Sequence, residues 1–315
     1  MTRAVVFAYH NVGLRCLATL LAHGLEVPLV VTQRDSPGEN VWFASVAGFA
    51  AERGIETAFP DDPNEPAFAA RVEAIAPDFL FSFYYRRMLG PRLLAAARRG
   101  ALNMHGSLLP KYRGRAPVNW AVIRGESETG ASLHYMTGKP DAGAVVGRQR
   151  VPILPEDTAR EVFDKVTLAA ELVLDAALPA LLAGRAPAVA QDLAAGSYFG
   201  ARRPADGRID WSQSAHAIHD LVRGVAPPYP GAFASVGGVP LRILRTRVEP
   251  ARSGAAAVPA PGAPRAPALY CEGAHCYADC ASGDRLRLLQ FEIDGRAAGA
   301  AEVTARFGSE PAIFD

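Results

Sequence analysis

The stretch ALNMHGSLLPKYRGRAPVNWAVIRGESETG, residues 101–130, decides the fold and raises the question of function. It opens with an apolar segment, 101–105, that has the length of a buried strand but carries Asn103 and His105. Side chains alternate along a strand, so these two polar groups project from the same face. Both lie at the carboxyl end of the segment, where doubly wound α/β sheets bind their ligands.

Upstream of this stretch, strand-like and helix-like segments alternate. Short β-branched or aromatic runs predict strands, and apolar residues at helical spacing predict helices between them. The expected strands are 4–8, 26–32, 55–59, 78–83 and 101–105, and the expected helices are 13–24, 40–54, 68–77 and 92–100. Ser36 to Glu39 resembles a capping box ahead of the second helix. This alternation predicts an α/β domain with a Rossmann-like, mostly parallel sheet that has helices on both faces.

Downstream, two further strands are expected at 129–136 and 143–153, and Thr158 with Glu161 caps a long helix toward Leu182. A polar, Gly- and Pro-marked segment follows, so we place the domain boundary at residue 203. The catalytic domain would then span 1–203 and a C-terminal domain 204–315. That second part has one short helix and several short strands, which predict a smaller, OB-like β-barrel. Residues 251–268 are rich in Ala, Pro and Gly and are expected to form a flexible connection.

The charge balance argues against a polyanionic partner. Lys and Arg total 33 against 32 Asp and Glu, which gives no overall field for capturing DNA or RNA. Cations concentrate at Lys111 to Arg115, and we interpret this run as a local site for a small anion or polar ligand. The first ten residues contain neither a secretory signal nor a membrane span, so we expect a cytoplasmic protein without membrane insertion.

The sequence also argues against several cofactors. Neither G-x-G-x-x-G nor G-x-x-x-x-G-K-[ST] occurs, which disfavours a dinucleotide cofactor or P-loop phosphate transfer. Cys271, His275, Cys276 and Cys280 lie close together but lack paired C-x-x-C elements, so we expect packed thiols in a β domain and no metal site.

Asp141 completes the candidate site. One helix and one strand separate it from His105, so we expect it beyond the carboxyl end of the adjacent strand, within reach of the imidazole. An amide donor, an imidazole base and a carboxylate suit acyl transfer, because amine attack on a carbonyl creates an oxyanion and an ammonium together.

Plainer interpretations remain open at this point. A histidine at a strand end is commonly structural, and an aspartate before Ala-Gly is commonly a turn residue. We treat His134, His216 and His219 as structural, and His10 likewise, although His10 ends the first strand at the same sheet edge. Ser107 lies in HGSLL rather than G-x-S-x-G, so a serine hydrolase is not expected.

The quoted stretch and the later DAGAVV resemble the folate-dependent N-formyltransferases, the family of methionyl-tRNA formyltransferase and of sugar formyltransferases. The Asn-x-His pattern, SLLPKYRG and the Asp-Ala-Gly occur in the family's order and at its spacing. Three more segments carry the resemblance, namely AYHNVG (8–13), FSFYYRRML (81–89) and PPYPGAF (227–233).

The resemblance implies a formyl donor, 10-formyltetrahydrofolate, an amine acceptor, no metal and no covalent enzyme intermediate. It implies that Asn103 and His105 bind the formyl oxygen, and that Asp141 holds and charges His105 and helps to remove the amine proton. The residues that it implies for folate binding are Arg87, Met88, Leu89, Arg115, Thr137, Gly138, Lys139, Pro140 and Asp141.

In detail the sequence is most similar to the branch of the family that formylates UDP-4-amino-4-deoxy-L-arabinose, which implies a role in lipid A modification and polymyxin resistance. The first alternative is formylation of methionyl-tRNA, which the balanced charge disfavours. The second is a folate-binding or nucleotide-sugar-binding protein without turnover, which would have no need of an oxyanion donor pair.

Overall fold

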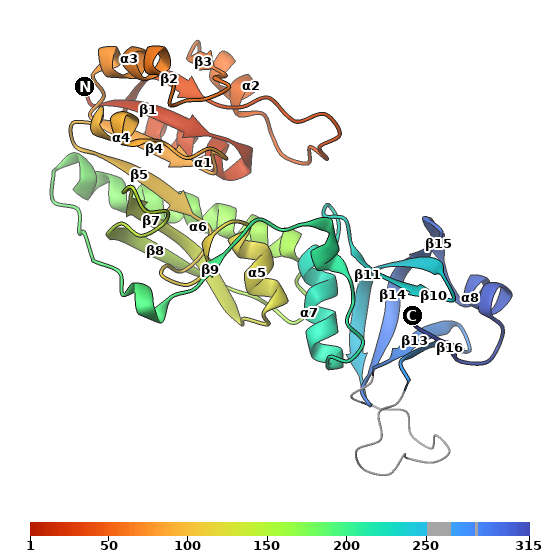
Figure 1. Cartoon of the computed structure of the whole chain (residues 1–315). Helices are drawn as coiled ribbons and strands as arrows, with labels where there is room; N and C mark the ends of the chain where they lie inside the picture. The colour runs from red at the N-terminus through yellow and green to blue at the C-terminus, as the bar shows by residue number, and fades with distance from the viewer. Residues whose placement is uncertain (251–265, 281–282) are drawn as a thin grey trace. The chain divides into compact units, whose positions relative to one another are not determined.

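The computed structural model describes residues 1–250, 266–280 and 283–315, and most of the segment expected to be a flexible connection lies outside them. The chain forms two compact units (Figure 1). The first comprises Met1–Val118, Glu128–Pro152 and Phe163–Ala201, and the second comprises Asn119–Ser127, Ile153–Val162 and Arg202–Asp315. The domain boundary at residue 203 stays a prediction.

The first unit is built on a seven-stranded sheet of order β3-β2-β1-β4-β5-β7-β8. Strands β3 to β5 in this order are parallel, whereas β7 is antiparallel to β5 and β8 is antiparallel to β7. The strands are β1 (Arg3–Ala8), β2 (Glu26–Val31), β3 (Glu56–Ala58), β4 (Phe79–Phe83), β5 (Gly100–His105), β7 (Glu128–Tyr135) and β8 (Val145–Pro152). The predicted mostly parallel α/β fold is confirmed.

Helices cover this sheet because its central strands are apolar on both faces. All five residues of β4 are buried. On one face, α3 and α4 pack Val72 and Leu93 against Val5 and Leu80. On the other, α1 approaches closely at Gly13, where a Cβ atom would lie 3.1 Å from the Cβ of Ala8. The helices of this unit are α1 (His10–Ala22), α2 (Val46–Ala51), α3 (Pro66–Ile75), α4 (Pro91–Ala95) and most of α6 (Ala159–Leu182), whereas α5 (Pro117–Ile123) belongs mainly to the second unit.

The second predicted helix, 40–54, is wrong at its start. Helix α2 begins only at Val46, and its N-cap is Ser45, whose Oγ accepts the Gly48 N–H at 3.1 Å. Glu39 does accept the backbone N–H of Ser36, but the segment Ser36 to Glu39 forms a turn that no helix follows. The chain between this turn and Ser45 is not helical because Trp42 and Phe43 pack against the ring of His10, a tertiary contact that overrides the helical pattern.

The second unit contains an antiparallel sheet of order β10-β11-β14-β13-β12-β16, with β15 paired to β14. A further bridge between Val236 and Phe314 brings the two edges together, so the sheet is a nearly closed barrel, as predicted. The elements are β10 (Ala232–Val236), β11 (Val239–Glu249), β12 (Ala268–Glu272), β13 (His275–Asp279), β14 (Arg285–Ile293), β15 (Arg296–Ala298), β16 (Ala312–Ile313), α7 (Ala215–Val225) and α8 (Ala300–Phe307), with a short 3-10 helix at Pro204–Gly207.

The barrel core accounts for the cysteine cluster. Cys271 and Cys276 are directly opposed on β12 and β13, with 3.0 Å between their Sγ atoms, and Cys280 is fully buried. Within the described ranges, no group of three or more His, Cys, Asp or Glu side chains is arranged to hold a metal ion. The same ranges contain no helix that combines the length and apolarity needed to cross a bilayer.

Candidate active site

Strands β5 and β7 bring three polar side chains to one face of the sheet. Asn103 and His105 are two residues apart on β5, and His134 of β7 is the residue directly opposite Asn103. The Asn103 amide nitrogen lies 3.1 Å from Nε2 of His134. His105 and His134 are buried, whereas Asn103 is partly exposed.

Backbone carbonyls fix the tautomers of both imidazoles. Nε2 of His105 lies 2.7 Å from the Tyr112 carbonyl oxygen, and Nδ1 of His134 lies 2.8 Å from the Tyr135 carbonyl oxygen. A carbonyl can only accept, so each of these nitrogens carries a proton. In the neutral rings, Nε2 of His134 therefore accepts from Asn103, and Nδ1 of His105 keeps a lone pair.

The Asp141 carboxylate lies between the two rings. Its Oδ1 is 3.6 Å from Nδ1 of His105 and 3.6 Å from Nε2 of His134, and its Oδ2 accepts the Gly114 N–H at 2.8 Å. Asn103, His105 and Asp141 are thus brought together, and His134 joins them, although the sequence indicated only a structural histidine there.

The route by which Asp141 reaches His105 differs from the expected one. Because β7 is antiparallel to β5, Tyr135 at its carboxyl end pairs with Leu102, away from the His105 end. Asp141 does follow the carboxyl end of an adjacent strand, as expected, but that end does not lie beside His105. The β7–β8 loop instead folds back toward His105 and is held there by Gln191, whose amide nitrogen donates to the carbonyls of Asp141 at 3.0 Å and Gly143 at 2.6 Å.

The segment 112–114 holds both His105 and Asp141. Its short strand β6 (Arg113–Gly114) pairs with β9 (Tyr198–Phe199), and the Tyr112 ring stacks on Phe199 with centroids 5.2 Å apart. Gly114 has φ +99°, and a Cβ there would lie 2.1 Å from the Phe199 carbonyl oxygen. Only glycine fits a backbone that must pack so closely and still donate to Asp141.

Burial and charge set the protonation states. Burial lowers the pKa of His105 despite the opposing effects of Asp141 and the Tyr112 carbonyl, so the imidazole is neutral at pH 7. Burial alone would raise the pKa of Asp141. The positive charge that His105 carries when it is protonated, the nearby His134 imidazole and the hydrogen bond from the Gly114 N–H outweigh it and hold that pKa well below its usual range. The site at neutral pH is a carboxylate beside a neutral base.

Two family models match the chain. The formyl transferase model matches residues 15–178, and the model of the formyl transferase C-terminal domain matches residues 202–307. The chain belongs to the formyl transferase family. The resemblance seen in the sequence and the prediction of a formyltransferase are confirmed.

Solved structures of formyltransferases share the fold. An N-formyltransferase from Helicobacter canadensis, in complex with folinic acid and dTDP-3-aminofucose, has a TM-score of 0.69 at 17% identity over 91% of this chain and 99% of its own. A sugar 3N-formyltransferase, solved in the presence of dTDP and 5-N-formyl-THF, has a TM-score of 0.69 at 16% identity, covering 94% and 99%. A 4-N formyltransferase from Francisella tularensis has a TM-score of 0.60 at 16% identity, covering 74% and 91%.

In this formyltransferase, the residues implied for folate binding differ in exposure. Arg87, Met88 and Arg115 are exposed, and so are Thr137, Gly138 and Lys139 of the β7–β8 loop, whereas Pro140 is partly exposed. Leu89 is only 7% exposed and packs in the core with Leu93. The side chain of Leu89 therefore anchors residues 87–89 to the core, and Met88 presents an apolar surface to solvent.

The remaining candidates have structural partners. Ser107 is fully buried and donates its hydroxyl to the Lys111 carbonyl at 2.6 Å, an arrangement that supports the loop. His219 contacts the Thr246 hydroxyl and the Pro155 carbonyl oxygen, each at 3.0 Å.

His134 and Gln191 are the site residues that sequence reasoning missed. Antiparallel pairing of residues 131–136 with 101–105 was the signal that could have found His134, because that pairing sets it opposite Asn103. Gln191 gives no such signal, since it lies outside every strand and helix.

Proposed function

We propose that this protein transfers a formyl group from 10-formyltetrahydrofolate to the 4-amino group of a UDP-linked amino sugar. The first candidate is UDP-4-amino-4-deoxy-L-arabinose, whose formylation belongs to lipid A modification and polymyxin resistance. The observation that carries the proposal is the convergence of Asn103, neutral His105 and Asp141 at one sheet edge.

The geometry assigns a separate task to each residue. Asn103 uses one amide N–H on His134, and its second N–H would donate to the formyl oxygen as negative charge develops there. The attacking amine would pass its proton to Nδ1 of His105, and Asp141 would stabilise the resulting imidazolium. The same proton then leaves on the donor nitrogen as its bond to the formyl carbon breaks.

One sequence-based role changes in this proposal. The N–H of His105 is donated to the Tyr112 carbonyl, so the neutral ring has no donor to offer the formyl oxygen. His105 fits the base better than the oxyanion donor, and Asn103 is left as the donor.

The residues implied for folate binding fit an anionic donor with a flat ring. Arg87 and Arg115 are exposed cations that form no ion pair with a carboxylate in the described part of the chain, so they could bind the carboxylates of a folate tail. Met88 is 55% exposed, and its flexible thioether could pack against an aromatic ring. The donor would supply the formyl group, and the residues above would bind and orient it.

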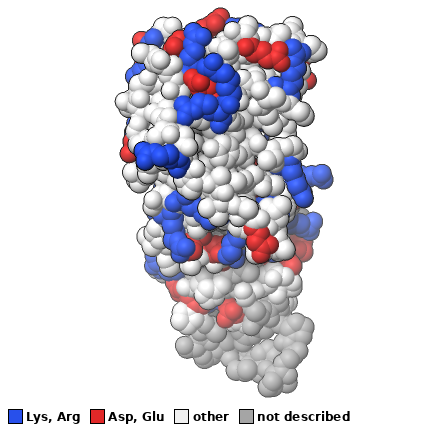
Figure 2. Space-filling model, turned by 90° about the vertical axis from the view of Figure 1, so that its left-hand side faces the viewer, with Lys and Arg blue, Asp and Glu red and all other residues white. Residues whose placement is uncertain are grey.

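Two observations support a small acceptor over tRNA. The net charge is +1, and on the face that Figure 2 shows, Lys and Arg side chains form several separate groups interspersed with Asp and Glu. A protein that binds a long polyanion uses a continuous basic surface. Relatives of similar fold were solved with a dTDP-linked amino sugar or with dTDP.

The test is an acceptor comparison with purified protein and 10-formyltetrahydrofolate. We expect UDP-4-amino-4-deoxy-L-arabinose to gain the mass of one formyl group in place of hydrogen, with release of tetrahydrofolate in equal amount. Formylation of methionyl-tRNA without formylation of the sugar would overturn the choice of acceptor and keep the chemistry. Turnover of neither would refute the proposal.

A further inference from the structure

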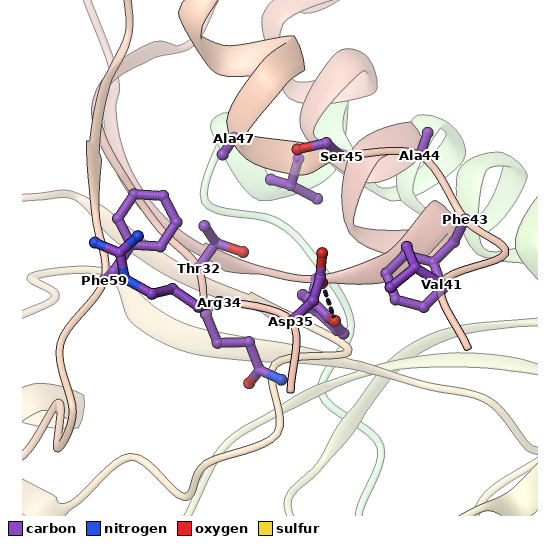
Figure 3. Close-up of a pocket in the computed structure, with 12 residues that line it drawn as sticks. Thr32, Arg34, Asp35, Val41, Phe43, Ala44, Ser45, Ala47 and Phe59 are labelled. Atoms are coloured by element: carbon purple, nitrogen blue, oxygen red, sulfur yellow. Dashed lines mark hydrogen bonds between the residues drawn. The ribbon is translucent and has the colours of Figure 1, made fainter. Parts of the chain in front are cut away.

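A cavity of about 300 Å³ lies in the first unit, beyond the carboxyl ends of β1 and β2, and the proposed mechanism does not use it (Figure 3). Phe59 and Arg34 lie at one end of the cavity, Val41 and Phe43 lie at the other, and Thr32 and Asp35 lie between them. Its volume is at the lower end of the range for small-molecule sites, which is roughly 300–1,000 Å³. It suits one part of a nucleotide-linked sugar.

Arg34 supplies a positive charge at this cavity. Its guanidinium lies over the Phe59 ring, 4.9 Å from the centroid, and makes no ion pair within the described residues. By contrast, Arg86, which lies over the neighbouring Tyr9 ring, is paired with Glu39. A guanidinium held over an aromatic ring and without a carboxylate partner is suited to bind a phosphate.

Asp35 supplies an acceptor in the middle of the cavity. One of its carboxylate oxygens accepts the Tyr9 hydroxyl at 2.5 Å, which orients the carboxylate. Asp35 follows β2, the place at which doubly wound nucleotide-binding folds put an acidic residue on the ribose 2′-hydroxyl. Because the first βα turn of this chain lacks the glycine-rich pyrophosphate loop, the expected ligand is a single nucleoside rather than a dinucleotide.

The walls can receive a flat base. The rings of Tyr9 and Phe43 meet edge to face, 5.0 Å apart, and Phe59 is 38% exposed. Exposed aromatic faces stack with any nucleobase.

The distance between the cavity and the catalytic residues Asn103, His105 and Asp141 suits a single substrate that reaches both. In the sheet order, β2 and β5 are separated by three strand-to-strand steps, or roughly 14 Å at about 4.8 Å a step. That span is comparable to an extended nucleoside diphosphate joined to one sugar ring. A chain of ring contacts crosses this span: the centroids of Phe43 and His10 are 4.0 Å apart, those of His10 and Phe163 are 4.5 Å apart, and those of Phe163 and Tyr84 are 5.6 Å apart. The Tyr84 hydroxyl lies against Gly106, the residue after His105.

We propose that this cavity binds the ribonucleoside of the acceptor, with Asp35 on the ribose 2′-hydroxyl and Arg34 on the phosphate. The inference rests on the proposed function, because it takes the acceptor to be a nucleotide-linked sugar. It also predicts the specificity of binding: because Asp35 contacts the 2′-hydroxyl, the protein binds a ribonucleotide more tightly than the corresponding deoxyribonucleotide.

Calorimetric titration of the whole protein with UMP, dUMP and uridine tests this inference without turnover. We expect UMP to bind about tenfold more tightly than dUMP, as one hydrogen bond to a charged group allows. Asp35→Asn should abolish that preference. Arg34→Gln should weaken the binding of UMP about tenfold and leave the binding of uridine unchanged, because uridine has no phosphate. Arg53→Gln is the matched control, since Arg53 also lies over a phenylalanine, Phe49, but does not line the cavity.

The outcomes separate this inference from the proposed function. The nucleoside site would be overturned if the wild type bound UMP and dUMP equally or did not bind UMP. It would also be overturned if both variants bound these ligands as the wild type does. Each of these results would do so even if the protein formylates a UDP-amino sugar. If the protein binds these ligands as expected but formylates no such sugar, the nucleoside site stands and the proposed function is overturned.

Discussion

At the scale of single residues, His105 has one nitrogen that is fixed and one that is available. The Tyr112 carbonyl accepts from Nε2, while Nδ1 faces the Asp141 carboxylate at 3.6 Å. Burial keeps the ring neutral, and Asp141 favours the proton once it arrives. The opposed effects of burial and charge make this imidazole suited to take up and release a proton within one turnover.

Asn103→Ala should lower kcat on the order of 100-fold or more, because it removes the proposed oxyanion donor. The Kd for the donor should change far less, since the interaction strengthens as charge develops. Single-turnover rates and a folate-binding titration would measure the two effects. A variant with wild-type kcat would show that Asn103 only orients His134.

Asp141→Asn should change both the magnitude of kcat/KM and its dependence on pH. In the wild type the acid limb should lie below the ordinary histidine pKa, because burial lowers the pKa of His105. Asp141 opposes that shift, so removing its charge should lower the His105 pKa further and move the acid limb to lower pH. A limb that moved upward, or a wild-type limb above pH 6.5, would contradict this assignment.

At the scale of elements, the site depends on the direction of β7, which the sequence did not predict. The stretch 101–105 was correctly predicted to be a strand that carries Asn103 and His105 on one face. Its neighbour β7 was found, but its direction was not, because the apolar pattern of a strand is the same in either direction. Direction decides that His134 faces Asn103 and that the loop must fold back to bring Asp141 to His105.

Gly114→Ala tests the support of that loop. The substituted residue would meet the Phe199 carbonyl at 2.1 Å and carry a strained φ of +99°, so the Gly114 N–H should lose its place at Asp141. We expect reduced stability and a loss of kcat that approaches that of Asp141→Asn. The matched control is Gly24→Ala, where φ is +74° but no atom lies within 4 Å of the added Cβ, so the cost should be about 1 kcal/mol with kcat unchanged. Equal effects of the two substitutions on kcat would refute this role.

At the scale of the whole molecule, the sequence indicated both the α/β fold and the barrel, because repeated short segments make these patterns clear. It misplaced the start of α2, since the packing of Trp42 and Phe43 on His10 joins segments far apart in the chain. The same limit hid the cavity at Arg34 and Asp35, whose walls come from several separate segments.

The small net charge has a measurable consequence for the whole protein. If the acceptor is a nucleotide-linked sugar, raising the salt concentration from about 50 to about 200 mM should change its KM less than tenfold, since few phosphate contacts are involved. Dependence on salt by a factor of about 1,000 would indicate a polyanionic acceptor such as tRNA.

The most direct test of the account is the rate of formyl transfer by the wild type, His105→Ala and His216→Ala, measured with the melting temperature of each. His216 is an exposed histidine on α7 and serves as the matched control. The account predicts wild-type turnover with His216→Ala, and a loss of about 100-fold or more with His105→Ala in a protein that remains folded. Turnover by folded His105→Ala within a few fold of the wild type would contradict it.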